Sequence, residues 1–295
     1  MQATGFDFGA GQFTVTATGL TSNTTYFIKA YAKNSEGITY GEEIEITTDP
    51  DVFGNALDFR RTNTIVEFGD VLDNIGDITI EAWVYPTQLG VLQNIIYKGD
   101  YGDGSPATEN VNYSLRILAD DAISIFWETS GESNISGSSD AGAITEINKW
   151  YHIAITRTVG ATSDVHIYLN GELIKTVTGL ANAGGGESGP LYMGSLNDLT
   201  DEASCILDEV RIWNDVRTQT EIQDNMGVIL DATAEPDLAA YYRFDQGTAE
   251  GDNAGITELI DYKGCNNGTL VNFALTGTEN NWVAAPVEAT PIIIS

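Results

Sequence analysis

The chain has 295 residues, of which 42% are hydrophobic, so it is long enough to bury the core of one or two domains. Its formal net charge of -30, from 43 acidic and 13 basic residues, repels nucleic acid and anionic lipid and argues against both as partners. Because no run of eighteen apolar residues occurs, no segment is expected to insert into a membrane.

The first 49 residues contain strand-like runs joined by polar turns, and Asp49-Pro50-Asp51 marks a domain boundary. The run from Leu20 to Gly37 resembles the last strands of a fibronectin type III domain, and Tyr26 stands where that fold has its tyrosine corner. A complete domain of that type needs about seven strands. We therefore expect residues 1–49 to be a partial fibronectin type III-like segment.

From Gly54 onward the sequence is a series of short alternating runs separated by turn residues. A β-meander is predicted around Trp150–Gly171, where Asn170-Gly171 is the pair preferred in a two-residue type I′ turn. One helix is predicted at Gln219–Met226, preceded by the capping-box residues Thr218 and Glu221. Many strands with one short helix predict an all-β, two-sheet sandwich of the jelly-roll type.

The runs DITIEAWVYP, NKWYHIAITRT, DVHIYLNGELI and ILDEVRIWNDV, in this order, resemble a laminin G-like domain. The resemblance is to the concanavalin A-like, pentraxin-related subgroup of bacterial surface proteins, and it covers about Gly54–Met226. We expect residues 238–284 to complete the same sandwich, because their apolar faces are too small to fold alone. The predicted domain is therefore 50–287, and residues 288–295 are expected to be a linker to a further module.

Asp208 is the most informative polar residue of the sequence. Strand periodicity places it on one face with the aliphatic side chains of Ile206, Val210 and Ile212. A carboxylate among aliphatic side chains is costly to bury alone, so it needs a cation or several N–H donors. Asp58, in the first strand of the predicted domain, raises the same question.

The laminin G-like resemblance implies that Asp208 and Asp58 contribute to a structural calcium site made of oxygen ligands. The alternative is a salt bridge to Arg60, Arg61 or Arg211. Arg60 and Arg61 stand where related domains often have Asp-Gly, which favours this alternative.

Two features could bind a ligand. The loop Gly99–Asn110, with Asp100, Asp103 and Asn110, resembles a ligand or calcium loop, although a solvated insertion is the simpler interpretation. Trp127 leads into a polar segment and is a candidate platform for stacking a sugar ring; the alternative is a partly buried strand residue.

The two cysteines, Cys205 and Cys265, both replace residues that are usual in the domains that this chain resembles. Two departures that are both cysteine favour a disulfide bridge between them. Two buried free thiols are the alternative.

No sandwich-glucanase pattern E-x-D-x-x-E, no G-x-S-x-G and no H-E-x-x-H occurs, so the sequence predicts no enzyme. The resemblance implies a non-catalytic module that binds carbohydrate or a glycoconjugate, stabilised by calcium, in a secreted or cell-surface adhesion protein with neighbouring domains. The alternatives are a structural spacer of a large adhesin and an accessory domain of an extracellular hydrolase.

Overall fold

The structure is a computed structural model that describes residues 13–15, 25–47, 54–60, 63–100, 110–131, 133–184, 189–196, 200–285 and 292–294. The chain divides into two compact units. Met1–Val52 and Pro286–Ser295 form the small unit, and Phe53–Ala285 form the large unit. No helix in these described ranges is long and apolar enough to cross a membrane.

The small unit contains two antiparallel strand pairs. β2 (Thr25–Asn34) pairs with β3 (Gly37–Thr47), and β1 (Phe13–Val15) pairs with β20 (Ile292–Ile294). The C-terminal segment expected to be a linker thus contains a strand that pairs with an N-terminal one. The fibronectin type III resemblance of this unit, with Tyr26 in β2, remains a prediction.

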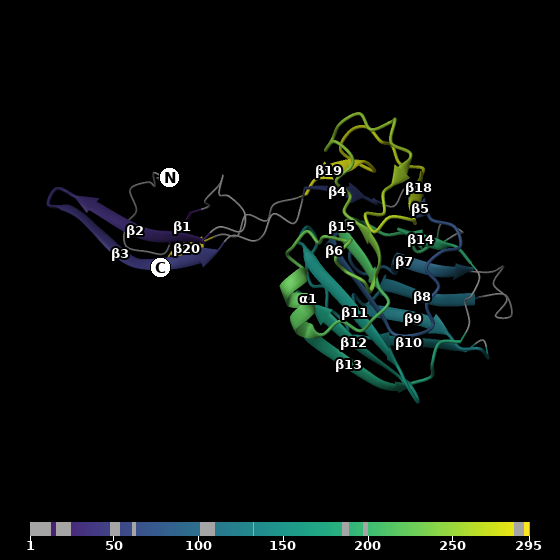
Figure 1. Cartoon of the computed structure of the whole chain (residues 1–295). Coiled ribbons are helices and arrows are strands. Elements are labelled where there is room, and N and C mark those ends of the chain that lie inside the picture. Colours follow the sequence, from purple (N-terminus) through teal and green to yellow (C-terminus); the bar gives the residue numbers. More distant parts are fainter. Residues whose placement is uncertain are drawn as a thin grey trace. The chain divides into compact units, whose positions relative to one another are not determined.

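The large unit is a sandwich of two antiparallel sheets (Figure 1). The β15 sheet consists, in spatial order, of β13 (Glu172–Leu180), β12 (Ser163–Leu169), β11 (Tyr151–Val159), β6 (Ile78–Pro86), β15 (Cys205–Trp213), β4 (Asn55–Asp58) and β19 (Trp282–Ala284), with β16 (Leu238–Tyr242) also paired to β15. The β8 sheet consists of β10 (Asn134–Ser138), β9 (Ile123–Glu128), β8 (Asn110–Ile117), β7 (Gln93–Asp100), β14 (Leu191–Met193), β5 (Ile65–Glu67), β18 (Gly268–Val271) and β17 (Glu258–Leu259). The all-β sandwich predicted from the sequence is confirmed, and residues after 237 supply strands to both sheets.

The core lies between the two sheets, because every second side chain of their strands points inward. Ile80, Ala82 and Val84 of β6 belong to the same buried cluster as Leu115 and Ile117 of β8. The remaining side chains of these strands lie on the outer faces of the sheets, where the polar groups of the molecule gather.

The predicted meander is β11–β12–β13. Thr158 is the cross-strand partner of Asp164, and Ile153 is the partner of Leu169, as the alternation in this stretch predicts. Asn170 and Gly171 have φ angles of 51° and 77°, which a type I′ turn requires.

Helix α1 (Gln219–Asn225) has the predicted capping box between Thr218 and Glu221 and ends one residue earlier than expected. Its buried residue, Ile222, packs on Ala154 and Tyr168 of the β15 sheet. Figure 1 shows α1 against the outer side of this sheet. The helix therefore covers part of a face that would otherwise be open to solvent.

One sequence prediction about β15 is wrong. Asp208 faces Trp83 across the sheet, while Arg211, three residues further, faces Glu81, two residues back on β6. The extra residue is a β-bulge at Glu209, whose φ is 49°. Val210 and Ile212 consequently lie in the core, whereas Ile206 packs in a separate cluster with Trp150. Strand periodicity fails here because it assumes an unbroken ladder.

Candidate functional site

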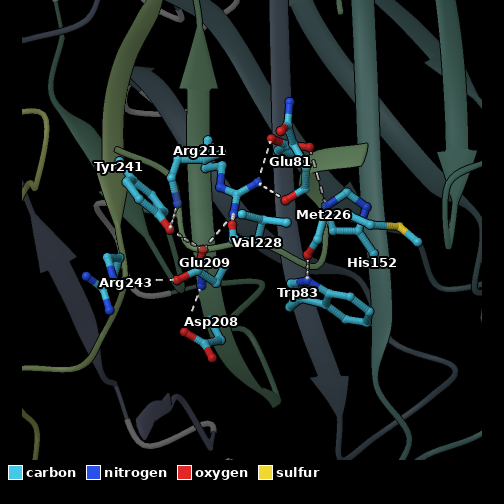
Figure 2. A network of polar contacts seen from close by, with 12 residues as sticks. Glu81, Trp83, His152, Asp208, Glu209, Arg211, Met226, Val228, Tyr241 and Arg243 are labelled. Atoms are coloured by element: carbon cyan, nitrogen blue, oxygen red, sulfur yellow. Dashed lines mark hydrogen bonds and ion pairs between the residues drawn. The ribbon is translucent and has the colours of Figure 1, made fainter. Parts of the chain in front are cut away.

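A network of charged and aromatic side chains lies on the outer face of the β15 sheet (Figure 2). It follows a row of cross-strand partners: Tyr241 on β16, Arg211 on β15 and Glu81 on β6. The strand neighbours Ile212 and Ile80 lie in the core, so this row lies on the opposite face. All three side chains are nevertheless fully buried.

Glu81 accepts two side-chain hydrogen bonds at one oxygen. Trp213 Nε1 donates to its Oε1 at 3.0 Å and Arg211 Nη1 at 3.4 Å, while His152 Nε2 lies 3.4 Å from Oε2, which accepts no hydrogen bond among the described residues. Burial tends to raise the pKa of Glu81, but the neighbouring His152 and the charge of Arg211 outweigh it and lower the pKa to about 2. Glu81 is therefore ionised in the folded protein.

Arg211 connects the sheet to the chain that follows α1. Its Nη2 donates to Glu209 Oε2 at 2.6 Å and to the backbone oxygen of Val228 at 2.7 Å, and its Nη1 donates to that of Asn225 at 2.9 Å. The fork of the guanidinium thus binds carboxylates on two strands and carbonyls beyond the sheet.

Glu209 completes the network at the bulge. The Tyr241 hydroxyl donates to Glu209 Oε2, and Arg243 Nε lies 3.8 Å from its Oε1. Burial raises the pKa of Glu209, while the charge of Arg211 acts in the opposite direction. Because its charges are matched and buried, this network holds β16 and the end of α1 on the sheet. Glu81, Glu209, Arg211 and Tyr241 are buried, and Arg243 is the partly exposed member of the network.

Asp58 and Asp208, the predicted metal ligands, also lie on this outer face and are fully buried. Arg60 Nε is 3.0 Å from Asp58 Oδ2, and the backbone N–H groups of Arg60 and Asn280 donate to the same carboxylate. Burial raises the pKa of Asp58 to about 6, although Arg60 opposes the shift. Asp58 therefore forms the salt bridge that the sequence offered as the alternative to calcium.

Asp208 has no ion pair among the described residues. Its Oδ1 accepts one hydrogen bond, from the backbone N–H of Glu209 at 2.8 Å, and its Oδ2 has no partner. Burial and the charge of Glu209 raise the pKa of Asp208 well above its ordinary value.

The donor set around Asp208 fits calcium poorly. Calcium takes about six to eight oxygen ligands, and Asp208 offers one free carboxylate oxygen. Within the described residues, no group of three or more His, Cys, Asp or Glu side chains could hold a metal ion. A calcium site here would rely on backbone oxygens, and it stays a prediction.

The predicted bridge between Cys205 and Cys265 is not formed. Cys205 is a free thiol in the core between the sheets, and Cys265 is an exposed free thiol in the turn between β17 and β18. Both thiols are free, as the alternative predicted, but Cys265 is exposed, whereas that alternative expected two buried thiols.

The prediction that Trp127 stacks on a sugar is wrong. Its side chain is 0% exposed and belongs to the core between the sheets. Its Nε1 donates to the backbone oxygen of Ala181, and its ring lies 5.3 Å from the guanidinium carbon of Arg157. Trp127 is a core residue, as the alternative held.

The candidate loop after β7 is described only at its ends. Asp100 and Asn110 are backbone partners where β7 meets β8. Asp103 lies outside the described residues, so a role for Asp100, Asp103 and Asn110 in ligand binding remains a prediction.

The outer face of the β8 sheet carries a second row, which the sequence analysis missed. Phe126, Ser114, Tyr97 and Tyr192 are cross-strand partners on β9, β8, β7 and β14. Apolar side chains including Leu196 pack with the two tyrosines, and Phe126 is partly exposed. This row holds three aromatic rings on the face away from the core; the two tyrosines are buried there, and Phe126 is the partly exposed ring.

The alternation of inward and outward side chains along each strand could have revealed this row. In ISIFWE, the apolar residues Ile123, Ile125 and Trp127 alternate and lie in the core. Phe126, not Trp127, must then face outward. The position of Trp127 next to a polar segment does not place its side chain on the outer side of the strand.

Arg116 stands beside this row, two residues after Ser114 on β8. Its guanidinium carbon lies 4.5 Å from the centre of the Phe126 ring. Among the described residues Arg116 has neither an ion pair nor a hydrogen bond, and its Nε is buried without an acceptor. Burial lowers its pKa, against the opposing effects of Tyr97 and Asp201. The Ser114 Oγ is likewise buried without a partner.

Comparison with known proteins identifies the superfamily of this sandwich. The sequence profile described as the concanavalin A-like lectin/glucanases superfamily matches residues 60–223, which include Arg116 and, from the ionic network, Glu81, Glu209 and Arg211. No curated protein matches the chain.

Among solved structures, a candidate carbohydrate-binding protein from Bacteroides ovatus ATCC 8483 is 20% identical, with a TM-score of 0.55 over 92% of this chain and 72% of that one. A serum amyloid P-like pentraxin from Limulus polyphemus is 16% identical over 59% of this chain and 82% of that one, with a TM-score of 0.44. The CBM40 module of a Ruminococcus gnavus sialidase, solved with α2,3-sialyllactose, is 14% identical over 57% and 95%, also with a TM-score of 0.44. The first likeness supports the fold; the other two scores are too low to support an argument.

Proposed function

The chain belongs to the concanavalin A-like lectin/glucanase superfamily, and from that premise we propose that it is a non-catalytic carbohydrate-binding module. Its binding surface is the outer face of the β8 sheet. The observation that carries the proposal is the row of aromatic side chains on this face, next to a guanidinium that has no partner among the described residues.

The chemistry of this face suits a sugar. Aromatic rings stack on the apolar C–H faces of pyranose rings, while a few polar groups fix the orientation of the ligand. Phe126 provides a partly exposed ring and Arg116 provides N–H donors, whereas the Ser114 hydroxyl beside them is fully buried. The candidate carbohydrate-binding protein of similar fold supports the same class of ligand.

A non-catalytic role is supported by the location of the carboxylates. Hydrolysis of a glycoside requires two carboxyl groups in contact with the substrate. Glu81 and Glu209, which lie together on the β15 sheet, are buried and bound to Arg211. We accordingly expect a module that binds and does not cleave.

The setting we propose is a secreted or cell-surface adhesion protein in which neighbouring domains flank this module. Calcium bound at Asp208 is the remaining part of this proposal. It predicts that EDTA lowers the melting temperature of the wild-type protein by several degrees and has no effect on Asp208→Ala. An EDTA-insensitive wild-type protein would remove calcium from the proposal.

A glycan array, run with calcium and with EDTA, tests the function. We expect at least one class of glycan to bind, and we expect Phe126→Ala to weaken that binding tenfold or more because the stacking ring is lost. Phe27→Ala, which removes an exposed ring from the small unit, is the matched control and should leave binding unchanged. Bound glycan incubated with the protein should release no new reducing ends.

The outcome separates the alternatives. If no glycan binds under either condition, the chain is a spacer and the proposed function is wrong. If Phe27→Ala weakens binding and Phe126→Ala does not, the surface has been misplaced.

A further inference from the structure

Arg116 differs from the other buried cations of the large unit. Lys98 forms ion pairs with Asp70 and Asp73, and Arg157 donates to backbone carbonyls of Asn74 and Gly76. Arg116 is largely buried and has no acceptor among the described residues. The chain has 43 acidic residues, so carboxylates that could pair with an arginine are plentiful.

The guanidinium of Arg116 packs on an aromatic ring and forms no ion pair with the described residues. It lies over the Phe126 ring at 4.5 Å, a cation–π contact that fixes the plane of the group and leaves its N–H fork without an acceptor. Asp201 is near enough to influence the charge of Arg116, yet the two form no ion pair. An ordered, partly desolvated guanidinium is a receptor for a planar anion.

The second polar group on the same face is Ser114, whose Oγ is buried and has no partner. Because Ser114 and Arg116 are two residues apart on β8, their side chains point the same way at a spacing of about 6.6 Å. Ser114 is fully buried, so Arg116, which is only partly buried, is the group of the two that a ligand on this face would reach.

We propose that the outer face of the β8 sheet recognises an acidic sugar, whose carboxylate is bound by the fork of Arg116 while its ring stacks near Phe126. The inference rests on the proposed carbohydrate-binding function and names its ligand class. A carboxylate suits the fork better than a hydroxyl does, because its two oxygens accept in parallel.

The net charge of the chain limits the kind of glycan. At -30, the protein repels a polyanion at a distance, but this repulsion is screened beyond about 8 Å in physiological salt. The ligand is therefore a largely neutral glycan that carries isolated carboxylates, not a densely charged polymer.

The test is an array in which each acidic glycan is paired with the neutral glycan of the same backbone, made by reducing the carboxylate to the alcohol. Sulfated versions of the same backbones form a third arm. The proteins are wild type, Arg116→Gln, Arg116→Lys and Lys175→Gln. Lys175→Gln removes the same charge from a partly exposed position on β13, where Lys175 pairs with the exposed Asp140, and controls for net charge.

We expect wild type to bind acidic members at least tenfold more tightly than their neutral partners. Arg116→Gln should abolish this preference, Arg116→Lys should retain only part of it because the fork is lost, and Lys175→Gln should keep it. Unchanged melting temperatures of the Arg116 variants would show that the fold is intact.

Three results overturn the inference. They are equal binding of acidic and neutral partners, an acid preference that survives Arg116→Gln, and tighter binding of the sulfated arm. Equal binding of both partners leaves the carbohydrate-binding function intact, whereas binding of no glycan in any arm removes the function itself.

Discussion

The outer face of each sheet carries an arginine beside an aromatic ring, but the two arginines differ in their polar partners. Arg211 lies 5.0 Å from the ring of Tyr241 and is bound to Glu81, Glu209 and two backbone carbonyls. Arg116 lies 4.5 Å from the ring of Phe126 and has no acceptor among the described residues. A buried charge that is fully matched holds the fold together, while an unmatched one beside an open ring is available to a ligand. The comparison predicts that one arginine matters for stability and the other for binding.

The largest effect is expected from Arg211→Ala. The substitution leaves Glu81 and Glu209 buried without their shared cation, and removing one partner of a buried ion pair typically costs about 3–5 kcal/mol. Urea denaturation should show this loss in the free energy of unfolding. A loss below about 1 kcal/mol would mean that water reaches the network and that the two faces do not differ as described.

The pH dependence of stability gives the next largest effect. The pKa of Glu81 is about 2 in the folded protein and 4.5 ordinarily, so its contribution of about 3 kcal/mol is fully present above pH 4.5 and is lost as the pH falls towards 2. Asp58 acts in the opposite direction, since its raised pKa of about 6 adds stability as the pH falls from 6 to 3.8.

The two effects are separated by comparing wild type with Glu81→Gln, because the contribution of Asp58 is common to both. The free energy of unfolding of Glu81→Gln should fall less steeply with acid below pH 4.5 than that of wild type. Parallel curves for the two proteins would show that Glu81 is not held ionised by its partners.

A smaller effect is expected from Asp208→Asn. The folded-state pKa of Asp208 is raised, so wild type loses stability as the pH rises through that pKa, whereas the variant does not. In the presence of EDTA and at pH values above that pKa, Asp208→Asn should be the more stable protein, since the buried oxygen that lacks a partner among the described residues no longer carries a charge. If instead the variant is less stable and no longer responds to EDTA, calcium is bound at Asp208.

The smallest effect on stability is expected from Arg116→Gln. Since the side chain has no polar partner to lose, the free energy of unfolding should change by less than about 0.5 kcal/mol. Thermal unfolding followed by circular dichroism would measure it. A loss as large as that of Arg211→Ala would place Arg116 among the structural cations and end the contrast between the two faces.

The sequence was sufficient for the sandwich, the meander and the capped helix, because these depend on local alternation and turn chemistry. The register of β11 with β12 follows from one turn at Asn170-Gly171. The sequence was not sufficient to predict which polar groups contact one another in the folded protein. The ionic network joins Glu81 to residues more than 120 positions later, and no local pattern indicates that such residues meet.

The two clearest errors of the sequence predictions assigned side chains to the wrong face of a strand. On β9 the sequence analysis chose Trp127, which lies in the core, one residue from Phe126 on the outer face. On β15 it continued the alternation through Glu209, where the strand contains an extra residue. In both cases a shift of one position exchanges the two sides of a strand. The aromatic row on the β8 sheet, by contrast, could have been read from the strands alone.

The bulge at Glu209 has a consequence for how this domain is compared with its relatives. An alignment that places no gap at Glu209 would match the inward residues of the second half of β15 with outward residues of an unbulged relative. Deleting Glu209 would restore regular alternation along β15 and would keep Arg211 opposite Glu81 and Ile212 in the core, but it would remove one of the two carboxylates that bind Arg211. A single inserted residue thus adds a second carboxylate to the ionic network without turning over the rest of the strand, and it is a place to look when related sandwiches differ in heat resistance.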